Sequence, residues 1–172
     1  MERFQITVGD IAQQNTQAVV NATDTTLLGG GEVSAAIRKA AGPQLAQACE
    51  KIGGCATGKA VVTPGFSMSA QYIIHTPGPL WQGGGNGEKQ LLASCYHSCL
   101  TLAGEKGILS IAFPSISTGA YHFPVNQAAE IAVKTIGSFL STNTSLKQVL
   151  LVCRDQRTRF IYEVSLQQYQ AK

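Results

Sequence analysis

Short stretches of apolar residues recur along the chain and predict the strands of a sheet. The first alternates between polar and apolar residues from Arg3 to Val8 and stops at the turn signal Gly9-Asp10. The later stretches are short apolar runs bounded by polar or turn-forming residues. They cover residues 18–20, 60–63, 72–75, 111–114 and 149–153.

Apolar residues at helical spacing lie between these strands and predict helices. The first predicted helix has Val33, Ile37 and Ala41 on one face and is broken by Gly42-Pro43. Pro124 suits the first position of a later helix, where a backbone N–H has no partner to lose. The remaining helical patterns cover residues 45–52, 91–103, 124–140 and 161–169.

Strands that alternate with helices imply an α/β domain with a largely parallel or mixed sheet. No repeat, linker or change of composition divides the sequence, so residues 1–172 are predicted to form one domain. A chain of 172 residues with 44% hydrophobic residues is typical of an ordinary globular protein that buries a substantial core.

Charge and hydropathy narrow the expected partners. No run reaches the roughly 20 apolar residues of a membrane-spanning helix, and Met1 to Phe4 lead straight into the first strand, so a cytoplasmic protein is expected. The net charge is +3, and the basic residues are scattered apart from Arg154, Arg157 and Arg159. Nucleic-acid-binding proteins carry denser basic patches, which argues against a nucleic-acid partner.

The cysteines offer two interpretations. Their number is odd, 5, and none forms a C-x-x-C pair, which argues against a disulfide framework in a chain of this length. Cys95 and Cys99 share a face of a predicted helix and could bind zinc together with His75 or His122, but the usual ligand spacing is missing. Buried apolar cysteines are the preferred interpretation, and no metal is predicted.

Two loops have the composition of an anion site. One runs from Asn21 through Gly29-Gly30-Gly31 to the helix that begins near Val33, and the other is Ser117–Tyr121, which precedes the helix opened by Pro124. Small residues leave backbone N–H groups accessible beside the positive end of a helix, an arrangement that suits a phosphate or diphosphate. From spacing alone, a tight turn without a ligand is an equal alternative.

Several motifs occur in a characteristic order along the chain. They are Val8-Gly9-Asp10-Ile11, Val20-Asn21-Ala22, Leu28-Gly29-Gly30-Gly31, Ala40-Ala41-Gly42-Pro43, Ile74-His75-Thr76 with Gly78-Pro79, Phe113-Pro114 with Ile116-Ser117-Thr118-Gly119, and residues 129–135. Together they resemble the macrodomain family, most closely the bacterial O-acetyl-ADP-ribose deacetylase type of the MacroD-like branch. The resemblance spans essentially the whole chain. It implies a macrodomain fold, an α/β three-layer α/β/α sandwich with a six-stranded mixed sheet.

The resemblance also implies a ligand and its contacts. The ligand would be ADP-ribose or an ADP-ribosylated substrate, with no cofactor. Asp10 would accept a hydrogen bond from the adenine amino group, and the amide of Ile11 would help to hold the ring. Tyr121 would pack near the distal ribose. The ligand-binding residues implied are Asp10, Ile11, Asn21, Gly29, Gly30, Gly31, Glu32, Val33, Ser117, Thr118, Gly119, Ala120, Tyr121 and His122.

Three positions depart from the family pattern together. Hydrolytic members carry Asn-Ala-Ala-Asn, a longer glycine run and Val-Asp, whereas this chain has Asp24, Glu32 and Ser34 at the second asparagine, the last glycine and the aspartate. Asp24 lacks the amide donor that would orient the distal ribose. A neutral serine at position 34 is no general base near pH 7 without a partner. Glu32 would repel a diphosphate if it lay in the cleft, or could point outward as a helix-start acid.

Further departures leave three functions open. Arg38 replaces a histidine common in the family, and His122 follows Tyr121 where a glycine is usual. We favour an ADP-ribose-binding macrodomain, a monomer, whose hydrolysis is weak or lost because Asp24 and Ser34 hold the catalytic positions. The first alternative is an active hydrolase of ADP-ribose esters that uses Asp24 or His122. The second is a module, closed by Glu32, that binds another nucleotide or a protein.

Overall fold

Within residues 2–172, the sheet has six strands in the order β1-β6-β5-β2-β4-β3. The structure is a computed structural model that describes residues 2–172. Neighbouring strands are parallel except for β3 and β4, which are antiparallel. The strands are β1 (Phe4–Val8), β2 (Ala18–Thr23), β3 (Val61–Pro64), β4 (Tyr72–Pro77), β5 (Ser110–Pro114) and β6 (Gln148–Cys153). The predicted mixed sheet is therefore confirmed.

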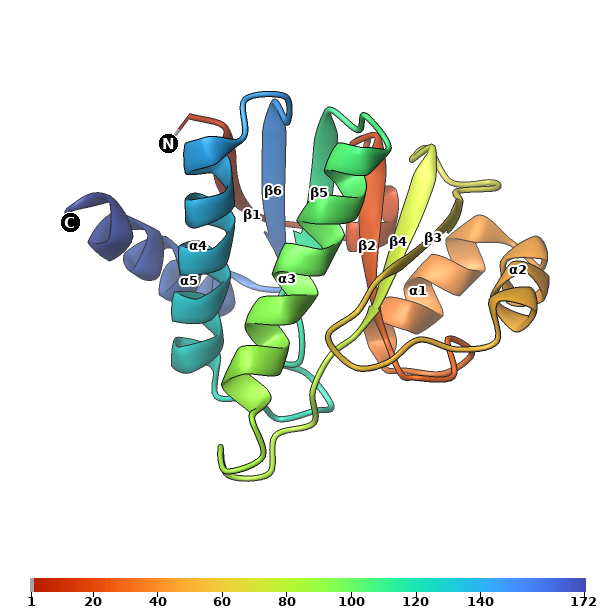
Figure 1. Ribbon diagram of the computed structural model, residues 1–172, viewed down its shortest axis with the longest axis horizontal. Helices are drawn as coiled ribbons and strands as arrows, with labels where there is room; N and C mark the ends of the chain where they lie inside the picture. Colours follow the sequence, from red (N-terminus) through yellow and green to blue (C-terminus); the bar gives the residue numbers. More distant parts are fainter. Residues whose placement is uncertain (1) are drawn as a thin grey trace.

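Helices cover both faces of this sheet and make the three-layer sandwich (Figure 1). Side chains of consecutive strand residues point to opposite faces. In β2, Val19 packs in the cluster that contains residues of α1 and α2, whereas Val20 packs with residues of α3, α4 and α5. The helices are the short 3₁₀ helix η1 (Ile11–Gln13), α1 (Glu32–Ala41), α2 (Gln44–Ile52), α3 (Glu88–Glu105), α4 (Val125–Thr142) and α5 (Gln156–Gln170).

Some boundaries differ from the sequence-based expectation for identifiable reasons. Pro124 is not the first helical residue: its ψ of 124° is extended, and it precedes α4 as the N-cap. The last helix begins earlier than its apolar pattern, because the Asp155 side chain caps it by accepting a hydrogen bond from the Thr158 amide. Asn21 lies inside β2 rather than after it, since the strand continues to pair with β4.

Four of the cysteines, Cys49, Cys95, Cys99 and Cys153, are buried, and Cys55 is partly buried. Burial raises the pKa of Cys95 to about 11, so its thiol stays protonated near neutral pH. Within residues 2–172, no His, Cys, Asp and Glu side chains gather in a group of three or more suited to a metal ion. Over the same residues, no helix combines the length and apolar character that a membrane crossing requires.

Candidate ligand-binding site

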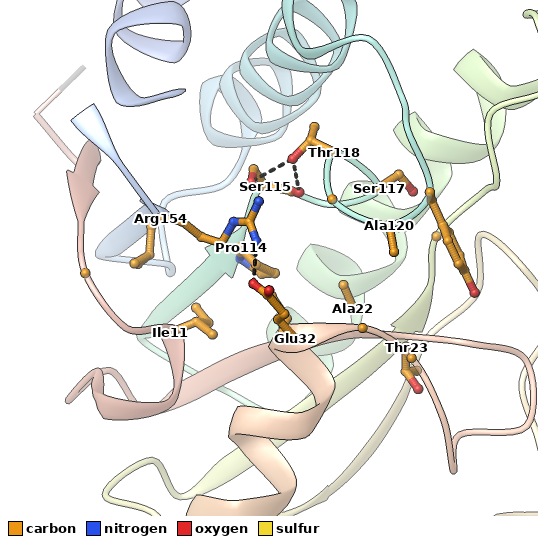
Figure 2. Close-up of a pocket in the computed structure, with 18 residues that line it drawn as sticks. Ile11, Ala22, Thr23, Glu32, Pro114, Ser115, Ser117, Thr118, Ala120 and Arg154 are labelled. Atoms are coloured by element: carbon orange, nitrogen blue, oxygen red, sulfur yellow. Dashed lines mark hydrogen bonds and ion pairs between the residues drawn. The ribbon is translucent and has the colours of Figure 1, made fainter. Parts of the chain in front are cut away.

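A cleft of about 440 Å³ lies at the carboxyl ends of the parallel strands, where α/β sheets bind their ligands. Its walls come from the ends of β1, β2, β4, β5 and β6 and from the first residues of α1, so segments far apart in the sequence meet there (Figure 2). The lining residues are Gly9, Ile11, Ala22, Thr23, Gly30, Gly31, Glu32, Val33, Gly78, Pro114, Ser115, Ser117, Thr118, Gly119, Ala120, Tyr121, Val152 and Arg154.

The glycine run forms one wall of this cleft and leads into α1. The N-cap of α1 is Gly31, and no side chain of residues 2–172 caps the helix, so its first amide groups remain available to an anion. The carbonyl of Gly29 accepts hydrogen bonds from Thr23 Oγ1 at 2.9 Å and from Ser34 Oγ at 3.0 Å. Gly30 and Gly31 line the cleft itself, where their small size lets a ligand approach the main chain.

The loop after β5 forms the opposite wall. It closes on itself through hydrogen bonds from the Phe123 amide to the Ser117 carbonyl and from the His122 amide to the Gly119 carbonyl. Thr118 Oγ1 donates to the Ser115 carbonyl at 2.8 Å (Figure 2). The buried Ser117 hydroxyl has no hydrogen-bond partner within residues 2–172, and Ser117 lines the cleft. This wall therefore offers a polar group that a ligand could satisfy.

The two ends of the cleft differ in polarity. At the end nearest β1 and β6, the lining residues Gly9, Ile11, Pro114 and Val152 are apolar or lack a side chain, which suits a flat aromatic ring. Arg154 follows β6 at the same end, and its guanidinium extends from there to Glu32 at the start of α1. At the other end, Tyr121 and Thr23 lie beside the glycine run. The pKa of Tyr121 is raised, mainly by burial and further by the neighbouring Asp24 carboxylate. A ligand with an apolar ring, a central anion and a polar end matches this order.

Asp24, a predicted catalytic residue, lies beside the cleft and is tied to its own turn. Its Oδ1 accepts hydrogen bonds from the Thr26 hydroxyl at 2.5 Å and from the Thr26 amide at 3.0 Å. These contacts, the hydroxyl first, lower the pKa of the carboxyl group. Asp24 is therefore ionised at neutral pH but is a weaker base than an ordinary aspartate, and it does not line the cleft.

Ser34, the other predicted catalytic residue, lies beneath the glycine run instead of in the cleft. It is fully buried, and its hydroxyl donates to the Gly29 carbonyl. Arg38 Nη1 donates to the same hydroxyl at 3.1 Å and to the carbonyls of Leu28 and Gly29. In this arrangement Ser34 and Arg38 fix the loop, and neither points at a reacting atom.

The other residues of the predicted site divide into two groups. Ile11, Gly30–Val33 and Ser117–Tyr121 line the cleft, whereas Asp10, Asn21, Gly29 and His122 do not. Each residue of the second group nevertheless adjoins a lining residue in sequence or in its loop. Asp10 follows β1, and its carboxylate accepts a hydrogen bond from the Ala12 amide at 2.9 Å. His122 is exposed and has a φ of 59°, in the left-handed region.

The Asn21 side chain is buried and forms a hydrogen bond from β2 to the neighbouring strand β4. Its Nδ2 donates to His75 Nδ1 at 3.1 Å, which leaves the His75 Nε2 hydrogen to be donated to Thr63 Oγ1 at 2.9 Å. Burial lowers the pKa of His75 to about 4, so the ring is neutral and can accept from Asn21. The Asn21 side chain thus joins β2 to β4 and β3 behind the cleft.

Glu32 lies at the cleft mouth and is paired with a residue that the sequence analysis did not assign to the site. Arg154 Nη1 lies 2.5 Å from Glu32 Oε2, and both residues line the cleft. Figure 2 shows the two side chains meeting between the end of β6 and the start of α1. Ligands of α/β sheets bind beyond the carboxyl ends of the strands, and this position could have indicated Arg154 and Val152 from the sequence, because both lie at the end of the last predicted strand.

A buried carboxylate organises the loop next to Tyr121. Glu88 is 2% exposed and accepts hydrogen bonds from the amides of Gln82, Gly84 and Asn86. The Gln82 amide contributes most to holding its pKa at about 2, below the ordinary 4.5. The adjacent Trp81 amide donates to the Tyr121 carbonyl at 2.9 Å. Glu88 therefore positions a segment that in turn holds the polar end of the cleft.

Replacing Glu88 by glutamine should lower the melting temperature by several degrees at pH 7, because the ionised acceptor of three amides is lost. A depressed pKa stabilises the folded state above the ordinary pKa of 4.5, and this contribution disappears as the pH falls through about 2. The gap between wild type and Glu88→Gln should therefore close between these pH values in thermal unfolding scans. Glu105→Gln, at the exposed far end of α3, is the control; an equal effect there would contradict the assignment.

Gly30→Ala should destabilise the fold by about 1–3 kcal/mol, because the residue has a φ of +120° and an added Cβ would lie 2.9 Å from Ser34 Cβ. Urea unfolding measures this change. Gly31→Ala is the matched control, since a Cβ there would meet nothing closer than Ala120 Cβ at 3.8 Å. Equal stabilities for the two variants would show that the glycine run is not held in this conformation.

The family model of the Macro domain matches residues 20–132, which contain the glycine run and the loop after β5. The chain belongs to the macrodomain family. The predicted family and fold are thereby confirmed. A Macro domain-containing protein of Lactiplantibacillus plantarum is 47% identical over 167 residues, which is 96% of this chain and 97% of the relative. The O-acetyl-ADP-ribose deacetylase of Salmonella gallinarum is 48% identical over 164 residues, 93% of this chain and 92% of the relative.

Solved macrodomains have the same fold. An Oceanobacillus iheyensis macrodomain mutant with ADPR superposes with a TM-score of 0.93 at 40% identity, covering 97% of this chain and 93% of that one. The Trypanosoma brucei macrodomain in complex with ADP-ribose gives a TM-score of 0.88 at 34% identity, covering 94% of this chain and 68% of that one. The layers and strand order described above are therefore those of the family.

Proposed function

We propose that the cleft of this macrodomain binds ADP-ribose. The uncapped N-terminus of α1, next to Gly30 and Gly31, carries the proposal because it offers free amides to a diphosphate at the centre of the cleft. The apolar end near Ile11 suits the adenine, and the end near Tyr121 suits the distal ribose. Relatives at 40% and 34% identity that were solved with ADPR and ADP-ribose support the same assignment.

The proposed chemistry is binding with slow hydrolysis. A general base works best when its pKa lies near the operating pH and when it reaches the proton or a water. Ser34 is buried under Gly29, and Asp24 has a lowered pKa and holds the Thr26 turn. Both positions that distinguish hydrolytic members are thus engaged in structural contacts in this chain.

An active hydrolase is the second candidate. It is favoured by the proximity of Asp24 to Tyr121, because the Asp24 carboxylate contributes, after burial, to the raised pKa of the Tyr121 phenol. It is also favoured by relatives at about 48% identity that are named O-acetyl-ADP-ribose deacetylases. In this version Asp24 would orient a water at the distal ribose, and turnover measurements distinguish the two candidates.

Calorimetric titration with ADP-ribose tests the binding proposal directly, and adenosine and ribose 5-phosphate serve as partial ligands. We expect ADP-ribose to bind more tightly than either part, because only the whole ligand spans the apolar end, the α1 amides and the Tyr121 end together. Absence of heat or of thermal stabilisation with ADP-ribose at millimolar concentration would overturn the proposal and favour the interpretation as a module for another ligand.

A further inference from the structure

The Arg154–Glu32 ion pair bridges the mouth of the cleft. Arg154 follows β6 and Glu32 is the first residue of α1, so the pair joins two elements that approach the cleft from different sides. Among the lining residues in the described part of the chain, Arg154 is the only basic side chain and Glu32 the only acidic one. An anion that enters the cleft beside Arg154 therefore meets a guanidinium that is already paired with the Glu32 carboxylate.

The position of Glu32 resembles that of an anionic ligand. Glu32 is the first residue of α1 and follows Gly30 and Gly31, so its carboxylate is carried on the segment whose amides would face the diphosphate of the proposed ligand. The Arg154 guanidinium points to the Glu32 carboxylate (Figure 2). In the free protein, the Glu32 carboxylate thus pairs with the Arg154 guanidinium, which could otherwise bind phosphate.

The pair is easily exchanged. The two side chains are 58% and 80% exposed, for Arg154 and Glu32 respectively, and ion pairs of such exposure contribute little to stability in water. A guanidinium binds phosphate oxygens in a two-pronged geometry that is stronger than a single contact to a carboxylate. Glu32 can turn into the solvent without leaving the helix N-terminus, which favours an acidic residue there.

We infer that Glu32 is an intramolecular competitor for Arg154, and that a ligand's diphosphate displaces it and takes over the guanidinium. This inference rests on the proposed function of the cleft. Arg154 is then a specificity-determining residue, because a ligand with a diphosphate can replace Glu32 on the guanidinium and a ligand without a phosphate cannot. Glu32 sets the affinity by the strength of its competition.

The test is a titration of ADP-ribose, ADP and adenosine against wild type, Glu32→Gln, Arg154→Met and the double variant, in about 0.15 M salt, where screening acts within roughly 8 Å. Glu32→Gln should tighten binding of ADP-ribose and ADP by about two- to fivefold, and Arg154→Met should weaken it by about tenfold. Adenosine should change less than about twofold in every variant. In the Arg154→Met background, the gain from Glu32→Gln should shrink, because no guanidinium remains to be released.

A matched control comes from another ion pair, which lies within α5. Glu163→Gln breaks the contact between Arg159 and Glu163 in α5, at 39% exposure for each side chain, and neither residue lines the cleft. This variant should bind all ligands like the wild type. An equal effect of Glu163→Gln and Glu32→Gln would overturn the inference in favour of a general charge effect.

The outcomes separate the exchange from the binding proposal. If neither the wild type nor any variant binds ADP-ribose, the proposed function and the proposed exchange are both wrong. If wild type binds but the gain from Glu32→Gln is as large or larger without Arg154, simple repulsion explains it and the exchange alone falls. A crystal structure with ADP gives the direct answer: Arg154 on the phosphates with Glu32 turned away supports the exchange, and an intact Arg154–Glu32 pair overturns it.

Discussion

Hydrolysis of O-acetyl-ADP-ribose by this protein is expected to be about 10²–10⁴-fold slower than by macrodomains that retain the asparagine and aspartate of the hydrolytic motif. That factor is what a positioned general base contributes. Here Ser34 Oγ donates to the Gly29 carbonyl, and the pKa of Asp24 is lowered by its contacts with Thr26. Initial rates at saturating substrate, with a motif-retaining relative assayed in parallel, measure the difference.

The contacts of Ser34 determine how activity should be restored. Ser34→Asp alone would place a carboxylate within reach of Arg38, whose Nη1 lies 3.1 Å from the present hydroxyl, and the resulting ion pair would lower the new carboxylate's basicity. Ser34→Asp combined with Arg38→His should therefore gain more activity than Ser34→Asp. Wild-type rates equal to those of the relative would refute the first expectation, and Asp24→Ala and His122→Ala would then identify the substitute base.

Asp10→Ala is expected to weaken binding of ADP-ribose by about 1.5–3 kcal/mol, or roughly 10- to 150-fold in Kd, if its carboxylate accepts a hydrogen bond from the adenine amino group. Asp10 does not line the cleft, but Gly9 and Ile11 on either side of it do. Its Oδ1 is engaged with the Ala12 amide, and Oδ2 is the oxygen left for a ligand. Calorimetry of the variant measures the loss.

Two controls separate adenine recognition from the cap of η1. Asp10→Asn keeps an oxygen for the Ala12 amide but removes the charge, so its melting temperature should match wild type while its affinity falls. A ligand with unsubstituted purine in place of adenine lacks the amino group and adds no acceptor at C6, so it should bind wild type and Asp10→Ala about equally well. Unchanged affinity of Asp10→Ala for ADP-ribose would remove Asp10 from the site.

The elements of the fold were largely predictable because their signals are local. Alternation and apolar runs located the strands, and the parallel ones end together at one edge of the sheet, which placed Gly30 and Ser117 in the same cleft. Ends of elements were less predictable, since they depend on single contacts. The Asp155 cap begins α5 ahead of its apolar stripe, and pairing with β4 keeps Asn21 inside β2.

The parts of the site that escaped prediction depend on contacts between distant segments. Arg154 and Glu32 are 122 residues apart in sequence, and no pattern along the chain pairs them. Ser34 reads as a weakened catalytic residue in the sequence, but only the Gly29 carbonyl and Arg38 reveal its structural use. The roles of Asp24, Asp10 and His122, and the monomeric state, stay predictions.

The pairing of β1 with β6 has a consequence for when the cleft can exist. Phe4 lies opposite Val149, so a strand made first is completed by the last strand of the sheet. Such non-local parallel pairings form slowly, and here they also deliver Val152 and Arg154 to the cleft. A chain still on the ribosome lacks this side of the cleft, so the proposed ligand would meet the complete site only after β6 has docked. Because a ligand that binds only the folded state stabilises it, binding of the proposed ligand would then stabilise the sheet in which β6 is paired.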